Sequence, residues 1–281
     1  MEPVVTLSRA FDSEIIAVML TLPRIYAFLT ASQLLNSNSI PMLPRTACIL
    51  SLALFAVPLN MEYAATFDRT AMNFIGYFAK EVAIGFLIGY LVGWTFWVVQ
   101  GAGGLIDNQR GAAIASSIDP LQGEESSPLG LMFSQVFLTY LFTTGAFMLL
   151  LGVLYRSYVL WPATKAVPII SDQFPVMALQ LFDYSMRTAI VMAAPVVAIM
   201  FVAEFALAMI SRFSPQIQVF VLAMPIKSML AIIVLIYYFQ SLMPFAQQQV
   251  LTSRDLTERL YEILRHGETL VAPQPPQKAV P

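Results

Sequence analysis

Hydrophobic residues fill most of this chain in long blocks, which short polar stretches interrupt. The blocks cover residues 14–35, 46–59, 71–100, 129–154, 176–211 and 216–244. A helix needs about 20 apolar residues to cross the hydrocarbon core of a bilayer. Some blocks are shorter than this and others are much longer. The pattern predicts an all-α integral membrane protein with about six hydrophobic segments of uneven length.

Three of the blocks do not match a simple span. Residues 46–59 are too short to cross the hydrocarbon unaided. The block 176–211 is too long for one ordinary span and has Pro195 near its middle, which predicts a long bent helix or two helices. A proline-arginine pair at 23–24 indicates a kink or a break in the first block. By contrast, residues 129–154 are predicted to form one complete span.

The chain changes character after residue 245. Apolar residues there repeat at helical spacing among charged ones, which predicts a short amphipathic helix over 246–266. Residues 267–281 are rich in proline and are predicted to form a disordered tail. The expected parts are therefore a membrane-embedded domain over 1–245, the amphipathic helix and the tail.

Composition strengthens the membrane interpretation. The chain is 58% hydrophobic and 11% charged, with a mean hydropathy of +0.72, whereas soluble domains carry about 25% charged residues. If all six blocks span, both termini lie on one side, and that side carries most of the lysines and arginines. The positive-inside tendency then places both termini in the cytoplasm, the C-terminus above all. No basic patch interleaved with aromatic residues suggests a nucleic-acid partner.

The third block carries a regular row of glycines. Gly85, Gly89 and Gly93 recur every fourth residue, so they lie on one face of a helix. Glu81 lies one step earlier on that face. A row of glycines lets another backbone approach closely, which is how helices pack where lipid supplies no hydrophobic drive. The row predicts a helix-packing surface.

The stretch that follows is polar and rich in small residues. Gly101, Gly103 and Gly104 are expected to loosen the helix, and a loop is predicted over 105–128. Exposure of such a stretch to lipid costs free energy, because its polar groups find no hydrogen-bond partners there. It is therefore expected to be buried in protein or to line a wet cavity. We interpret residues 81–120 as the working part of the protein.

Four charged residues, Glu81, Arg187, Glu204 and Lys227, lie within apolar blocks. Each would cost a few kcal/mol if it faced lipid at the midplane, so they predict ion pairs or a wet interior. Alternatively, Glu81 and Arg187 lie near block ends and reach the membrane interface by snorkelling. The partner of Lys227 is Glu204, Glu81 or an acid on another chain, and the sequence does not choose among them.

No catalytic set is visible in the sequence. The only histidine is His266 and the only cysteine is Cys48, which excludes a His/Cys zinc cluster and a Ser-His-Asp triad within the membrane. Cys48 is expected to be a small buried hydrophobe. The glycines at 101–104 lack the Gly-Lys-Ser/Thr of a P-loop. The sequence predicts a protein that is not an enzyme and has no cofactor.

Two blocks of sequence carry a resemblance to a known family. The first holds the strings KEVAIGFLIGYLVG and GGLIDNQRG, followed by the pair Asp119-Pro120, and the second is RFSPQIQVFVLAMPIKS at 212–228. In this order they resemble the T-type export-apparatus protein of type III secretion systems and its flagellar counterpart, the R-type biosynthesis protein. The resemblance covers residues 14–245. The lysine at position 227 makes the sequence more similar to the injectisome branch of the family than to the flagellar branch.

The resemblance implies an assembly. One copy of a member of that family joins several copies of two other small hydrophobic proteins. These partners are the R-type and S-type proteins of the export apparatus itself, and its U-type protein is a further partner. The helices are bent hairpins in a pore-forming hetero-oligomer of the bacterial inner membrane. Unfolded substrate proteins pass through this pore. Energy for export comes from other components.

The resemblance also implies roles for particular residues. The region after the glycine helix enters the pore and helps to plug the closed channel. This assigns plug or pore roles to Gly104, Asp107, Gln109, Gly111, Ser116, Ser117, Ile118, Asp119 and Pro120. In the second block, Pro215 and Gln216 are expected to fix a turn, and Lys227 to make a polar contact between subunits. An ordinary solvated hairpin loop is the alternative for residues 105–125.

A second function stays open at this point. A stand-alone secondary transporter would use helices broken near Pro195 and Pro225, with Glu204 and Lys227 at the membrane midplane. The sequence shows no internal repeat between its two halves that would favour this alternative.

Overall fold

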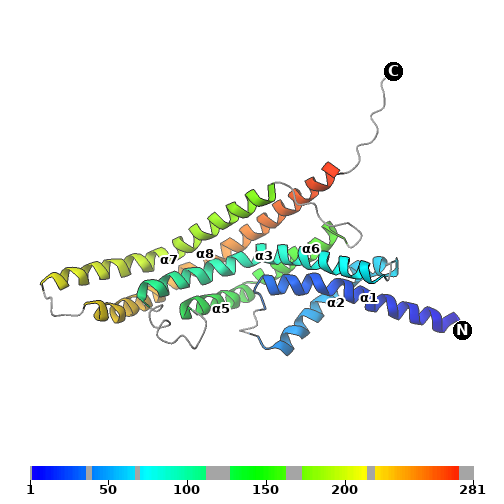
Figure 1. The fold of residues 1–281 in the computed structure, drawn as a ribbon. Helices are drawn as coiled ribbons and strands as arrows, with labels where there is room; N and C mark the ends of the chain where they lie inside the picture. The colour runs from blue at the N-terminus through cyan, green and yellow to red at the C-terminus, as the bar shows by residue number, and fades with distance from the viewer. Residues whose placement is uncertain are drawn as a thin grey trace, which may run out of the picture. The chain divides into compact units, whose positions relative to one another are not determined.

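The computed structural model describes residues 2–35, 40–66, 70–111, 127–162, 173–213 and 219–271. Within these ranges the chain forms helices joined by short turns, without a strand, so the all-α prediction is confirmed. The helices are α1 (Glu2–Ala31), α2 (Met42–Thr66), α3 (Ala71–Arg110), α5 (Pro128–Thr143), α6 (Ala146–Leu160), α7 (Gln173–Phe213) and α8 (Val219–Val271) (Figure 1).

The helices are long and apolar enough for a membrane. Among the described residues, five helices could cross a bilayer by length and composition, or up to six if α5 and α6 together count as one span. This confirms the prediction of an integral membrane protein with about six hydrophobic segments. Only 22% of the spanning window of α2 is buried within the chain. Cys48 lies on this helix and is exposed, so the expectation that it is buried was wrong.

The third helix is longer than the sequence predicted. α3 runs for 40 residues and ends at Arg110, so the loop predicted from residue 105 is wrong for 105–110. A glycine inside a helix costs about 1 kcal/mol relative to alanine. Here close packing offsets part of that cost, because a Cβ on Gly103 would lie 2.6 Å from the Cα of Gly130. The glycines allow a close contact and do not end the helix.

The block predicted as one span over 129–154 is not one continuous helix. α5 and α6 are separate helices, bent by 82° at a short break. Thr144 is the C-cap of α5, and Gly145 follows with a φ of 74°. Glycine reaches this left-handed conformation without the steric cost that a side chain would add, and it commonly follows a helix end. Gly145 within an otherwise apolar run was the overlooked signal.

Prolines inside the helices do not divide them. Pro23 lies inside α1, and Pro195 lies inside α7, which is therefore one long helix and not two. α8 contains Pro225 and Pro244 and continues to Val271. The change in composition at residue 245 is thus not a helix boundary. The predicted tail lies outside the described residues from 272 onward.

The chain divides into two compact units. Unit 1 comprises residues 1–93, 148–180 and 252–281, and unit 2 comprises residues 94–147 and 181–251. Since α3, α7 and α8 each contribute to both units, neither unit is a continuous piece of chain.

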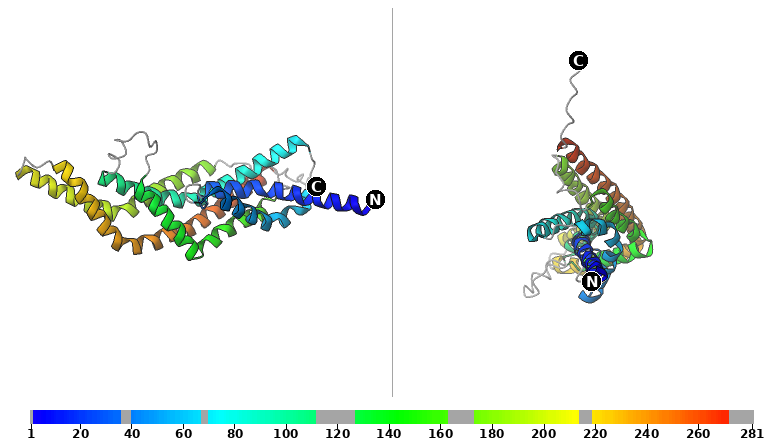
Figure 2. Two further views of the ribbon diagram at one scale, coloured as in Figure 1. Left: turned by 90° about the horizontal axis from the view of Figure 1, so that it is seen from below. Right: turned by 90° about the vertical axis from the view of Figure 1, so that its right-hand side faces the viewer.

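The core of unit 1 begins with α1 and α2, which lie side by side (Figure 2). Their buried side chains meet those of α3 in one cluster: Ile16, Ala17, Leu20, Val57, Ala64 and Tyr77. Because these residues come from three helices, burial of the cluster removes apolar surface from all three at once.

Aromatic side chains take part in the core of unit 2. The rings of Phe96 and Phe137 meet edge to face with centroids 5.1 Å apart. α7 and α8 run antiparallel in this unit, because the Tyr184 hydroxyl donates to Gln249 Oε1 at 2.6 Å while Lys227 lies near Glu204. The earlier of these residues on α7 thus contacts the later one on α8, and the later one on α7 contacts the earlier one on α8.

Candidate functional site

The glycine row of α3 lies against the backbone of α1. A Cβ on Gly89 would lie 2.5 Å from the carbonyl oxygen of Phe28, and one on Gly93 would lie 2.6 Å from that of Ala31. Gly85 is equally crowded by the Arg24 carbonyl. No side chain fits at these three positions, so the helices meet backbone to backbone. The surface that the sequence assigned to helix packing is occupied by a helix of the same chain.

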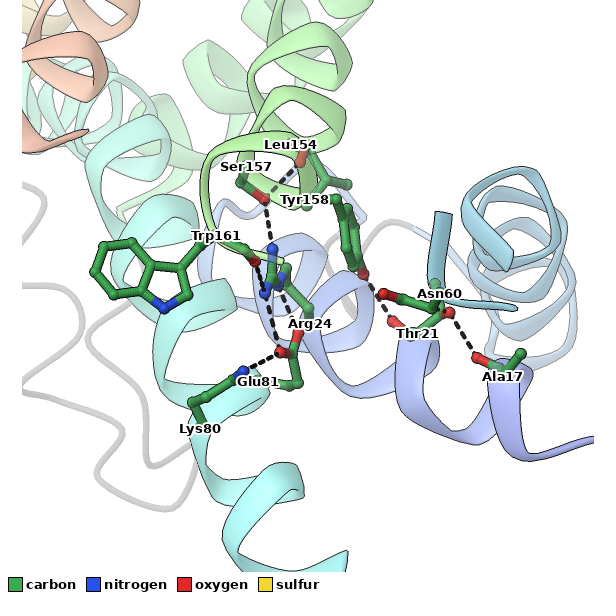
Figure 3. A network of polar contacts seen from close by, with 10 residues as sticks. All are labelled: Ala17, Thr21, Arg24, Asn60, Lys80, Glu81, Leu154, Ser157, Tyr158 and Trp161. Carbon is green, nitrogen blue, oxygen red and sulfur yellow. Dashed lines mark hydrogen bonds and ion pairs between the residues drawn. The ribbon is translucent and has the colours of Figure 1, made fainter. Parts of the chain in front are cut away.

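Glu81 continues this face of α3 and forms an ion pair with Arg24 of α1 (Figure 3). The guanidinium Nε lies 2.6 Å from Glu81 Oε2, and Nη2 lies 3.0 Å from Oε1. Both side chains are completely buried. Such a two-point pairing is the strongest geometry that arginine and a carboxylate can adopt. Glu81 therefore does not snorkel to an interface within this unit.

The remaining donors of Arg24 reach α6 and the residue that follows it. Nη2 also donates to the Trp161 carbonyl at 2.9 Å, and Nη1 donates to Ser157 Oγ at 3.2 Å. The Tyr158 ring lies 4.2 Å from the guanidinium carbon, and its hydroxyl donates to the Thr21 carbonyl at 2.8 Å. This polar network joins α1, α3 and α6 inside unit 1.

The sequence pattern missed the central member of this network. Arg24 was treated as part of a helix interruption beside Pro23, whereas it is a fully buried cation inside α1. An arginine within an apolar block is itself a signal of a buried partner. Asn60 of α2 was also missed. Its amide donates to Thr21 Oγ1 at 3.1 Å and adds α2 to the network.

In unit 2, a second polar cluster lies where α3 ends and α5 begins. Asp107 is 3% exposed as a residue. Its Oδ2 accepts hydrogen bonds from Ser127 Oγ at 2.6 Å and from the Leu129 backbone N–H at 2.9 Å. Its Oδ1 lies 2.7 Å from Arg110 Nε. Asp107 thus faces α5 and is shielded from solvent within this unit.

A glycine contact lies one turn before Asp107. A Cβ on Gly103 would lie 2.6 Å from the Gly130 Cα, and a Cβ on Gly130 would lie 2.8 Å from the Gln100 carbonyl oxygen. Gly104 lies nearby, since a Cβ there would lie 3.9 Å from the Ser127 side chain. We call Gly103, Asp107, Arg110, Ser127, Leu129 and Gly130 the α3–α5 anchor. It holds the two ends of the connection that runs from Gly111 to Ser127.

Among the described residues of unit 2, the other charged side chains lie on α7 and α8. Lys227 Nζ lies 3.3 Å from Glu204 Oε2, so within this unit the lysine pairs with the first of the three partners that the sequence left open. The Gln109 amide donates to the same oxygen at 3.3 Å. Glu204 therefore connects α3, α7 and α8. Arg187 is exposed on α7.

Several predicted site residues lie outside the described residues. These are Ser116, Ser117, Ile118, Asp119, Pro120, Pro215 and Gln216. Gly111 is the last described residue before the first of these stretches, and its φ is 90°. It faces the side chain of Met224 on α8, since a Cβ there would lie 3.5 Å from Met224 Cγ.

The polar groups in both clusters are arranged to hold helices together. Each acid described above accepts from an arginine, a lysine, a hydroxyl, an amide or a backbone N–H. In the part of the chain that the structure describes, no three His, Cys, Asp or Glu side chains are grouped so that they could hold a metal ion.

Comparison with known proteins gives these clusters a family context. Residues 15–253 match the family described as "Bacterial export proteins, family 1". The chain belongs to this family. The resemblance found in the two sequence blocks is therefore confirmed. The members of the family are structural components of secretion apparatus, and the family is not known as a family of enzymes.

Named relatives in this export family include proteins of type III secretion and of flagellar export. The chain is 39% identical over 248 residues to "Yop proteins translocation protein T" of Yersinia pestis, covering 87% of this chain and 94% of that protein. It is 32% identical over 211 residues to "Surface presentation of antigens protein SpaR" of Salmonella typhimurium, covering 75% and 78%. It is 30% identical over 226 residues to "Flagellar biosynthetic protein FliR" of Bacillus subtilis, covering 78% and 85%.

Proposed function

We propose that this protein is a structural subunit of the export gate of a type III secretion system. One copy joins several copies of the R-type and S-type membrane proteins, beside the U-type protein, and together they form the pore through which unfolded proteins leave across the inner membrane. The observation that carries the proposal is the match with "Yop proteins translocation protein T", which extends over nearly the whole of both chains. The length and composition of the apolar helices support a location in the membrane.

The proposal favours the injectisome branch over the flagellar one. The match with the Yop translocation protein is 39% identical, whereas the matched flagellar protein from Bacillus subtilis is 30% identical over a smaller share of both chains. Lys227, which the sequence associated with the injectisome branch, pairs here with Glu204. We place the C-terminus in the cytoplasm because its basic residues follow the positive-inside tendency.

The proposed plug is the connection between α3 and α5. Residues 112–126 join Gly111 to Ser127, and the α3–α5 anchor holds both ends. Gly104, Asp107 and Gln109 belong to the helical base of this connection, while Ser116 to Pro120 are assigned to the plug itself. The connection is rich in small residues, which would leave room for it in a narrow lumen.

The assembly part of the proposal is tested by native mass spectrometry after gentle detergent extraction from the source membrane. We expect one copy of this chain with several copies of two small hydrophobic proteins. A stable monomer with substrate-dependent flux would contradict the proposal and favour the transporter.

The plug part is tested separately by ion conductance of the assembled complex in planar bilayers. We expect deletion of residues 112–125 to make the closed pore leak ions, while the deletion complex keeps its subunit composition. A leak no larger than that of the wild-type complex, from a complex of correct composition, would refute the plug. Gly76→Ala serves as a matched control, because a Cβ at Gly76 meets nothing within 4 Å.

A further inference from the structure

We infer that Asp107 is a positioning residue that fixes the first turn of α5 to the last turns of α3. Any consequence of this positioning for a plug rests on the proposed function of the connection between these helices. Its effect on the helices themselves rests only on the geometry of unit 2. Asp107 was assigned to the pore or plug from the sequence, whereas its carboxylate is turned toward α5 and shielded from solvent within the unit.

The first argument is the set of partners around the carboxylate. Burial of a charged group is costly unless hydrogen bonds and opposite charge replace its water. Asp107 receives a hydroxyl and a backbone N–H from the start of α5, and the Arg110 guanidinium from its own helix. Its negative charge also lies at the N-terminus of α5, where the free N–H groups favour an anion. Both ends of the connection thus depend on one side chain.

Ser127 makes the arrangement reciprocal. Its Oγ accepts from the Gly130 N–H at 2.9 Å, so it is the N-cap of α5. The same hydroxyl donates to Asp107 at 2.6 Å. An N-cap of this kind contributes about 1 kcal/mol to a helix. Here the cap is held in position by a carboxylate from another helix, so loss of Asp107 would also weaken the cap.

The second argument is the glycine contact beside it. Gly103 and Asp107 are four residues apart and so lie on the same face of α3. Gly103 meets Gly130 backbone to backbone, and this sets the distance between the helices. The glycine contact selects the face of α5 that meets α3, but it supplies no hydrogen bond between the two helices. Asp107 supplies such hydrogen bonds by accepting from Ser127 and Leu129.

The test is residue-resolved hydrogen exchange on the full-length protein in its assembled complex. In Asp107→Ala, the Leu129 amide loses its hydrogen-bond acceptor. The Ser127 hydroxyl, which caps α5, loses the same acceptor. We expect exchange at Leu129 and Gly130 to rise about 10-fold or more, because local opening sets these rates. The control is Asp183→Asn, which removes an exposed carboxylate from α7 in the same unit and should leave both rates unchanged. Wild-type rates in Asp107→Ala would overturn the inference.

A swapped pair separates positioning from simple damage to the fold. Ser127→Asp alone places two carboxylates together and should speed exchange further. In Asp107→Ser with Ser127→Asp, a hydroxyl again donates to a carboxylate, and the new aspartate can cap α5. We expect the double variant to return the Leu129 rate to within about 3-fold of wild type, as coupled sites should. A double variant as fast as Asp107→Ala would show that the glycine contact alone holds α5 and would overturn the inference.

The outcomes for this residue and for the plug are independent. Slow exchange in the wild type and fast exchange in Asp107→Ala support the positioning role even if deletion of 112–125 causes no leak. Conversely, if Asp107→Ala does not change the exchange rates, the inference is overturned even when the deletion variant leaks.

Discussion

The two units treat the same kind of residue in different ways. In unit 1, Arg24 and Glu81 are both fully buried, and the pair has two contacts plus further donors from the guanidinium to α6 and Trp161. In unit 2, Lys227 and Glu204 make one contact at 3.3 Å, with side chains 11% and 49% exposed. Both pairs come from apolar blocks, so hydropathy alone does not distinguish them.

The difference in solvent exposure between the two ion pairs indicates different roles for them. A completely buried pair has no water to replace a lost partner, so its members depend on each other. A half-exposed glutamate can be hydrated, or can accept a contact from a neighbouring subunit. We therefore regard the Arg24–Glu81 network as internal structure of unit 1. We regard Glu204, whose side chain is 49% exposed, as a charge that remains available for a contact with a neighbouring subunit.

The largest effect is expected from breaking the buried pair. Arg24→Met leaves the Glu81 carboxylate buried without its main partner, which typically costs about 3–5 kcal/mol. We expect a marked loss of folded protein and of thermal stability in detergent. Glu81→Gln in the same chain should restore part of the loss, because it removes a buried carboxylate left with Lys80 Nζ, 3.4 Å away, as its cationic neighbour. A single variant as stable as the wild type would contradict the structural role of this pair.

A smaller but clear effect is expected at the glycine row. Gly89→Ala places a methyl group 2.5 Å from the Phe28 carbonyl oxygen, and such overpacking costs about 1–3 kcal/mol. Gly76→Ala on the same helix has open space and should gain about 0.5–1 kcal/mol from helix propensity. The two changes should therefore move the unfolding temperature in opposite directions. Equal shifts would contradict the close contact between α1 and α3.

A weaker effect on the isolated chain is expected in unit 2. Lys227→Met removes one contact from a glutamate that is already half exposed, so the loss should be at most about 1 kcal/mol. Its effect on co-purification of the proposed R-type and S-type partners should exceed its effect on thermal stability. Lys227→Arg keeps the charge and is the control. A loss of stability comparable to that of Arg24→Met would break the distinction between the two pairs.

The smallest effect is expected at the surface of unit 1. Arg156 and Glu258 form an ion pair at 2.8 Å with side chains 56% and 43% exposed. Exposed pairs of this kind contribute about 0–1 kcal/mol, and salt screens them. Arg156→Ala should lower the unfolding temperature slightly at low salt and not at about 1 M salt. A salt-independent loss would show that the side chain acts through packing.

The class of the protein was accessible from local patterns. Blocks of apolar residues predicted membrane helices, and the fold confirmed them. The two sequence blocks predicted the export family, and the family match confirmed that as well. Such features depend on composition, spacing and short motifs, all of which are written along the chain. The plug, the subunit counts and the side of the C-terminus remain predictions.

The tertiary structure decided which residues meet. Arg24 and Glu81 are 57 residues apart, and Asp107 and Leu129 are 22 apart, so no local period links them. It also decided that α3 continues through its glycines, because the stabilising contact with Gly130 comes from another helix. Hydropathy indicates whether each segment favours water or an apolar environment. The choice of partner for a buried charge, or for a glycine, depends on the packing of segments distant in sequence.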